Sequence, residues 1–166
     1  MWGQNAVKNE ALEQTHALFE ELVAFYISAL IREARLWDKV PQRDMQTKQV
    51  LFDPETGEIR MRAPTADEVL TRAEALTVKT HAHPDPSYDL SAVPGAARAP
   101  VVFRRAAIKR AIGLVKAYRS NLARWERRGR RGRMPGMPAV ERFPVTIYQG
   151  LGLVVREPLR SFLKVN

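Results

Sequence analysis

The sequence has no cysteine in its 166 residues. This excludes a disulfide framework, a thiolate metal site and a cysteine nucleophile. It also has no run of about eighteen apolar residues that would suggest a membrane span, and its first residues, MWGQNAVKNE, lack the basic-then-apolar order of a secretion signal. We therefore expect a cytoplasmic protein with no membrane partner.

Metal-ligating and catalytic side chains are also scarce. His81 and His83 lie one residue apart, a spacing found in some metal sites, and Asp85 and Asp89 follow closely. However, no further histidine is near, and a proline-rich loop is a poor platform for a metal. The 18 acidic residues form no clear catalytic pair, and no serine is paired with a histidine. The sequence predicts no metal, no cofactor and no active site.

Positive charge is plentiful but unevenly distributed. The net charge of the chain is +9, yet residues 98–133 alone hold 13 basic residues against one acid, Glu126, which gives +12. The rest of the chain has 14 basic and 17 acidic residues and is therefore slightly negative. A concentrated basic segment indicates an anionic partner, whereas scattered lysines would indicate only solubility.

Apolar periodicity predicts three helices. One amphipathic helix is expected from about residue 9 to 39, ending before Pro41. A second should begin at Thr65, where Glu68 completes a capping box, and run to about Thr80. A third should cover residues 100–127, with proline tolerated in its first turn.

The segments between and after these helices differ in composition. Two short alternating runs around the turn-forming residues 53–57 predict a small hairpin near 50–62, and the proline-rich residues 81–100 predict a surface loop. Residues 134–166 are expected to form a β-rich unit, with β-branched and aromatic residues around glycines 150 and 152. We found no internal repeat. The expected fold is α+β and mostly helical, with a helical region over 1–133 followed by short strands.

The third predicted helix has one broad apolar face. Its members are Ala107, Ile108, Ala111, Ile112, Leu114, Val115, Tyr118, Leu122 and Trp125. Tyr118 and Trp125 could stack on unpaired bases. Their helical spacing around Leu122 favours core packing instead.

The cations of this helix and of the loop after it are the candidate binding residues. They are Arg104, Arg105, Lys109, Arg110, Lys116, Arg119, Arg124, Arg127, Arg128, Arg130, Arg131 and Arg133. Lysine and arginine neutralise phosphates and release counterions, so such a group would bind nucleic acid with strong salt dependence. One alternative is that this segment is a solvated linker with no partner. A membrane surface is a less favoured anionic partner, because the apolar face of the helix resembles a face that packs in a protein core.

Residues 100–150, which include FRRAAIKRAIGLVKAYRSNLARW and the following RRGRRGRMPGMP loop, resemble the amino-terminal half of TnpB-like proteins. These are transposon-encoded RNA-guided nucleases related to type V CRISPR effectors. The resemblance implies a helical recognition region joined to a β-rich wedge, binding a guide RNA and its heteroduplex with target DNA by shape and phosphate contact. It also implies that Arg104, Arg105, Lys109, Lys116, Arg119 and Arg124 face that backbone, with Trp125 anchoring the helix.

The chain departs from that family by stopping at FLKVN, before any RuvC-like nuclease domain. We therefore expect a non-catalytic RNA-binding module, either a fragment or a subunit that completes a nuclease with a partner chain or a second copy. The alternative is a stand-alone DNA-binding or regulatory protein that uses the basic helix on duplex DNA.

Overall fold

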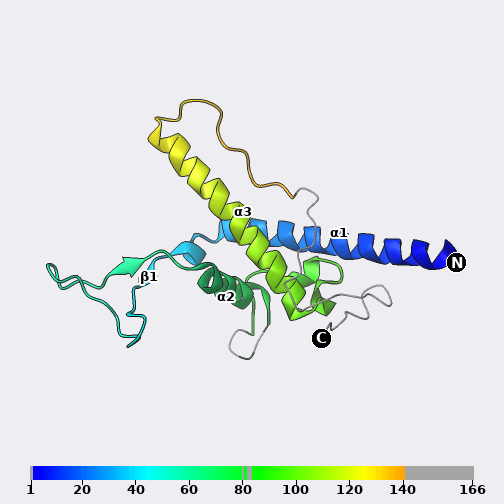
Figure 1. Ribbon diagram of the computed structural model, residues 1–166, viewed down its shortest axis with the longest axis horizontal. Helices are drawn as coiled ribbons and strands as arrows, with labels where there is room; N and C mark the ends of the chain where they lie inside the picture. Colours follow the sequence, from blue (N-terminus) through cyan, green and yellow to red (C-terminus); the bar gives the residue numbers. More distant parts are fainter. Residues whose placement is uncertain (1, 80, 82–83, 141–166) are drawn as a thin grey trace.

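The structure is a computed structural model that describes residues 2–79, 81 and 84–140. The fold is α+β and mostly helical, with one small antiparallel sheet in this part of the chain (Figure 1). In chain order the elements are α1 Trp2–Arg32, η1 Ala34–Trp37, β1 Val40–Pro41, β2 Met61–Arg62, α2 Ala66–Thr77, η2 Leu90–Ala92, η3 Ala96–Arg98 and α3 Val101–Arg127. The strands expected around glycines 150 and 152 lie outside the described residues, and residues 134–140 form no helix or strand.

The first helix does not extend to residue 39 as predicted. It ends at Arg32, and the chain turns at Glu33 into the short 3-10 helix η1. Trp37 folds back so that its Nε1 donates to the carbonyl of Leu30 at 2.9 Å. The apolar periodicity at Trp37 therefore arises from this return contact and not from a continued helix.

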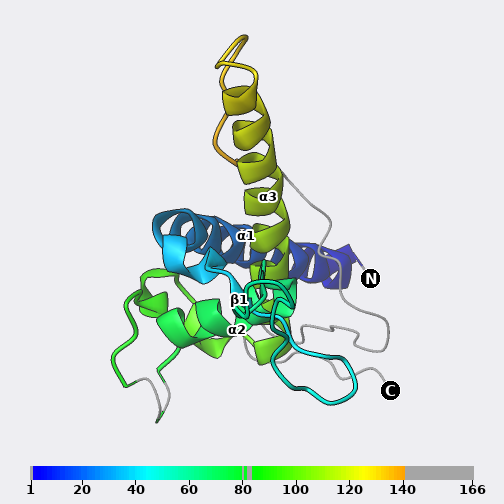
Figure 2. The same cartoon turned by 90° about the vertical axis from the view of Figure 1, so that its left-hand side faces the viewer.

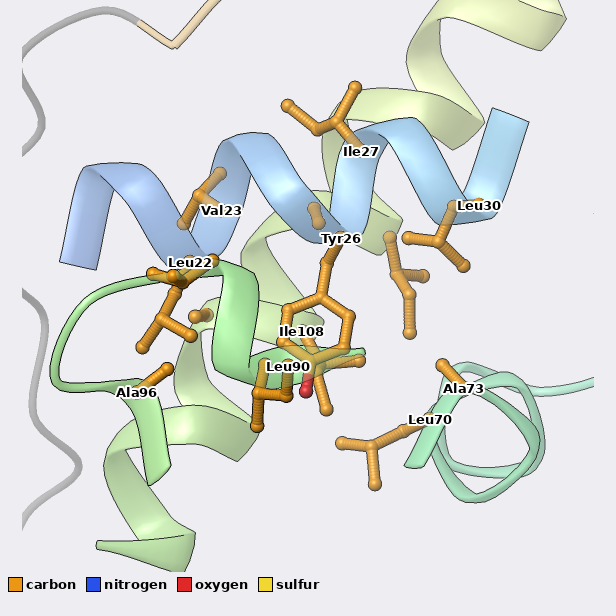
Figure 3. Close-up of a cluster of buried hydrophobic side chains, with 14 of the residues drawn as sticks. Leu22, Val23, Tyr26, Ile27, Leu30, Leu70, Ala73, Leu90, Ala96 and Ile108 are labelled. Carbon is orange, nitrogen blue, oxygen red and sulfur yellow. The ribbon is translucent and has the colours of Figure 1, made fainter. Parts of the chain in front are cut away.

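The core lies where α1 and α3 cross, with α2 against their side (Figures 1 and 2). Phe19 of α1 meets Phe103 of α3 edge to face, with ring centroids 5.3 Å apart. Small residues on α3, Ala107 and Ala111, are fully buried and allow close approach of the helices. Figure 3 shows α1 side chains, including Leu22 and Tyr26, converging with Ile108 of α3.

A hydrogen bond between two buried hydroxyls joins α1 to α2. Tyr26 is fully buried, and its hydroxyl lies 3.2 Å from Oγ1 of Thr77, which is 2% exposed. Thr77 Oγ1 also lies 3.0 Å from the carbonyl of Ala73 and donates its one hydrogen there, so Tyr26 is the donor in the pair. Burial raises the pKa of Tyr26, which keeps the hydroxyl protonated.

Helix α2 begins as predicted. The side chain of Thr65 accepts from the Glu68 amide, and the Glu68 carboxylate accepts from the Thr65 amide, so the capping box is complete. Arg62 also forms a bidentate salt bridge with the same carboxylate, with hydrogen bonds of 2.8 and 2.7 Å. Together these bonds lower the pKa of Glu68 from 4.5 to about 2, with the Arg62 bond the largest cause.

The proline-rich segment 81–100 is more than a surface loop, and in this respect the prediction was wrong. Its second half forms η2 and η3, and Leu90, Val93, Ala96 and Ala99 are buried in the main core. Tyr88 ties its first half to the end of α1 by donating to Glu33 at 3.1 Å. The prolines prevent a long helix or strand here, but the short 3-10 turns still place apolar side chains in the core.

Residues 40–62, which we call the β lobe, form two hairpins and not one. The predicted turn at 53–57 is present, with Phe52 bridged to Ile59, and an additional hairpin bridges Arg43 to Val50. The stem is the β1–β2 pair. At the centre, the amides of Gln42, Leu51 and Arg60 each donate to the carbonyl of another of the three, at 2.7 to 2.9 Å.

The two hairpins reveal an internal repeat that the sequence analysis missed. RDMQTKQV and FDPETGEI align with a spacing of nine residues. In each, an aspartate, Asp44 or Asp53, accepts from the backbone amides two and three residues later. Each turn then closes on a residue of positive φ, Lys48 at 60° and Gly57 at 70°. The repeat is short, and only the aspartate and the threonine are identical in its two copies, so it is recognised only once both turns are seen.

Candidate nucleic-acid interface

Helix α3 leaves the helical body after Val115, its last buried residue. The twelve residues from Lys116 to Arg127 extend the helix by about 18 Å. Figures 1 and 2 show this part of α3 projecting alone from the body, followed by a loop at its tip. We call residues 116–133 the arm.

The predicted core positions on the arm are not core residues. Tyr118, Leu122 and Trp125 are only half-buried, so the expectation that their helical spacing places them in the core was wrong. The loop after the helix covers part of this face, at Trp125. Val140 then packs against the core, so the chain returns to the body from the tip.

Trp125 organises the tip of the arm. Its Nε1 donates to the carbonyl of Gly132 at 3.1 Å, and the guanidinium of Arg130 lies 5.8 Å from its ring centroid. The Arg130 amide donates back to the Trp125 carbonyl at 3.0 Å. Gly129 and Arg130 both have positive φ, 66° and 60°, which bends the chain sharply after the helix. The loop is therefore tied to the helix and is not a free tail.

Eight predicted cations lie on the arm, and all are exposed. They are Lys116, Arg119, Arg124, Arg127, Arg128, Arg130, Arg131 and Arg133. The only acid of the arm is Glu126. Within residues 2–79, 81 and 84–140, no ion pair involves any of these cations. Arg119 is held differently, because its guanidinium lies 5.1 Å from the Trp37 ring centroid.

The predicted cations nearer the start of α3 are largely engaged by α2. Arg105 forms a bidentate salt bridge with Glu74, with hydrogen bonds of 2.8 to 3.1 Å. These bonds raise the pKa of Arg105. Lys109 Nζ lies 3.1 Å from Asp67. Arg104 is 12% exposed, lies 4.0 Å from the same Glu74, and places its Nε out of solvent. Arg110 is exposed.

Eleven of the twelve predicted residues thus divide into two groups, and Arg110 is the remaining one. The structure gathers the distal eight on one projecting element, while Arg104, Arg105 and Lys109 join α3 to α2. Arg105 and Lys109 therefore belong to the group next to α2, whereas Lys116 belongs to the arm. Sequence reasoning missed Trp37 and the role of Gly132, and no local pattern signals either contact because both depend on the path of the chain after a helix.

The grooves and the potential metal ligands in the described part of the chain offer fewer functional groups than the arm. A groove of about 390 Å³ between α2 and α3 is lined mainly by Leu70, Val102, Ala106 and the Lys109–Asp67 pair. No group of three potential metal ligands occurs in the described part of the chain. His83 lies outside that part. Among the described helices, none combines the length and apolar character needed to cross a membrane.

Comparisons with known proteins give a family and one named relative. The sequence profile of the Aq_aa04 family matches residues 1–157. The chain is 30% identical over 159 residues to the uncharacterized protein aq_aa04 of Aquifex aeolicus (strain VF5), a match that covers 92% of this chain and 82% of the relative. No solved structure matches.

Proposed function

The chain belongs to the Aq_aa04 family, and we propose that it is a nucleic-acid-binding module that contacts phosphates through the arm. The observation that carries this proposal is the exposure of eight cations, against one acid, on a single element that projects from the body. Exposed cations that form no ion pair within the described residues create a strong local positive potential.

The charge and the geometry support binding to a polyanion in particular. Like charges crowded on one helix and loop repel each other, and a phosphate backbone relieves that repulsion while counterions are released. The backbone of the tip is held by Trp125, so the cations after the helix start from a restricted geometry. Restriction before binding lowers the entropy lost on contact.

We propose RNA, including an RNA–DNA heteroduplex, as the preferred ligand. The support is the resemblance of residues 100–150 to TnpB-like proteins, in which recognition relies on backbone shape while base pairing reads sequence. The proposal includes a cytoplasmic location and a binding role without catalysis, with any nuclease activity supplied by a partner chain.

Duplex DNA is a second candidate because of the arm itself. An α-helix with its side chains is about 10–12 Å wide, and the major groove of B-form DNA is about 12 Å wide. The A-form major groove is too narrow for side chains to read. A projecting helix with cations around much of its surface thus fits a B-form groove, whereas A-form nucleic acid would have to contact it from outside the groove.

The test begins with the nucleic acid that co-purifies at low salt. A defined RNA that resists DNase and is removed by RNase supports the RNA proposal. Fluorescence anisotropy with single-stranded RNA, an RNA–DNA heteroduplex and duplex DNA of the same length then ranks the ligands. Preference for duplex DNA over both RNA-containing probes would favour the second candidate. Absence of binding to all three at low salt would refute nucleic-acid binding.

A further inference from the structure

The β lobe presents an exposed apolar face that the proposed function does not use. We call the three residues at the centre of the lobe, Gln42, Leu51 and Arg60, the junction residues. Each of them lies between two residues that pair with a neighbouring segment of the lobe. Because successive strand residues point to opposite faces, the flanking residues share the face opposite to the junction side chains. They are five apolar residues, Pro41, Val50, Phe52, Ile59 and Met61, together with Arg43 at the edge of the first hairpin.

Exposure and contacts agree with this assignment. Phe52 is 58% exposed, and Ile59 and Met61 are each 48% exposed. On the other face, Arg60 lies 3.8 Å from Asp53, and Arg62 binds Glu68 of α2. The charged face is therefore the one tied to the helical body. The apolar face points away from it, in the described part of the chain.

The two repeated hairpins beside this face carry opposite charge. The first, residues 43–50, contains Arg43, Lys48 and Asp44, a net charge of +1. The second, residues 52–59, contains Asp53, Glu55 and Glu58 and no base, a net charge of −3. Met45, at the first turn, is 86% exposed. An apolar face thus has one basic and one acidic edge.

We infer that the apolar face of the β lobe is a self-association surface that pairs with a second copy of this chain. In a twofold-symmetric interface, residue i of one copy meets residue j of the other, and j meets i. When the twofold axis runs between the two hairpins, placing the two apolar faces together brings the basic first hairpin of each copy against the acidic second hairpin of its partner. The lobe is complementary to itself in both hydrophobicity and charge.

A nucleic acid is a poorer occupant of this face because the second hairpin would repel its phosphates. The face offers fewer residues than the roughly 20–30 per side of a standard stable interface, so we expect a weak dimer. The inference is independent of the proposed function. If both hold, a dimer would carry two arms, and two linked contacts would strengthen binding to one long nucleic acid.

The test measures the mass of the full chain by analytical ultracentrifugation over a concentration series at low salt, after nucleic acid is removed. We expect the average mass to rise from one chain towards two. Phe52→Ser and Ile59→Ser should remain monomeric, and Val102→Ser, which changes an exposed apolar residue of α3, should behave as the wild type. Circular dichroism checks that each variant is folded.

A charge exchange tests the pairing itself. Lys48→Glu alone and Glu55→Lys alone should each be monomeric, because each places like charges at both contacts. An equal mixture of the two variants should dimerise, since every contact then joins opposite charges. The inference is wrong if the wild type stays monomeric at all concentrations, or if the mixture stays monomeric while the wild type dimerises. It is also wrong if Phe52→Ser weakens oligonucleotide binding without changing the mass.

Discussion

The Nε1 of Trp125 donates to the carbonyl of Gly132 at 3.1 Å, which closes the tip of the arm across seven residues. This bond and the Arg130 guanidinium over the same ring hold the loop to the end of α3. A tryptophan that the sequence suggested for the core thus serves instead to position a basic loop.

Replacing Trp125 should affect binding more than folding. Because the ring is half-buried, Trp125→Ala should cost less than the roughly 3–5 kcal/mol typical of a buried aromatic, and oligonucleotide affinity should fall as the loop loosens. Trp125→Phe keeps a ring under Arg130 but loses the bond to Gly132, so its affinity should be intermediate. Urea unfolding and anisotropy measure the two effects. A loss of stability as large as for a core residue, with affinity unchanged, would contradict this role.

The buried pair of Tyr26 and Thr77 predicts non-additive mutations. Tyr26→Phe removes one hydrogen bond and should cost about 1 kcal/mol, because Thr77 keeps its bond to Ala73. Thr77→Val leaves the Tyr26 hydroxyl buried without a partner and should cost about 1–3 kcal/mol. The double variant should cost less than the two single costs added together. Urea unfolding measures all three, and simple additivity would show that the two hydroxyls do not interact.

Two glycine substitutions should have opposite signs. Gly113 lies inside α3 with open space where a Cβ would project, so Gly113→Ala should stabilise the protein by about 0.5–1 kcal/mol. Gly57 has φ of +70°, and Gly57→Ala should destabilise the β lobe by about 1–2 kcal/mol. Hydrogen exchange should report the first change at α3 amides and the second at the Leu51 amide. Equal signs would contradict the assigned backbone geometry.

Acid should remove the contribution of Glu68. Its folded pKa is about 2 against an ordinary 4.5, so the stabilisation is complete above pH 4.5 and is lost as the pH falls towards 2. The group is 37% exposed, and we expect about 1 kcal/mol or less at neutral pH. Unfolding curves of the wild type and Glu68→Gln should therefore converge at low pH. Glu55→Gln is a control, and a constant difference across the pH range would contradict the prediction.

The sequence predicted elements whose signals are local. The start of α2 followed from Thr65 and Glu68, and the observed α3, Val101–Arg127, closely matches the predicted 100–127. What it could not predict depends on contacts between distant residues. The end of α1 is set by the fold-back of Trp37, and the second hairpin is completed by bonds among Gln42, Leu51 and Arg60.

The candidate site shows the same division. The basic segment was visible from composition alone, but the point at which α3 leaves the body was not. The apolar pattern runs without interruption from Val115 to Trp125, although only the first part of the helix is packed in the core. The engagement of Arg105 by Glu74 was also hidden, because these residues lie 31 positions apart.

The most direct test of the central claim is the salt dependence of binding for two variants of equal charge. The arm variant carries Arg124→Gln, Arg127→Gln and Arg131→Gln, and the control carries Arg35→Gln, Lys39→Gln and Arg98→Gln, which are exposed elsewhere. Both lose three positive charges. If the arm binds the backbone, the slope of log affinity against log salt should become shallower by about one unit per lost contact in the arm variant, and it should stay unchanged in the control. Equal slopes in both variants would contradict the account.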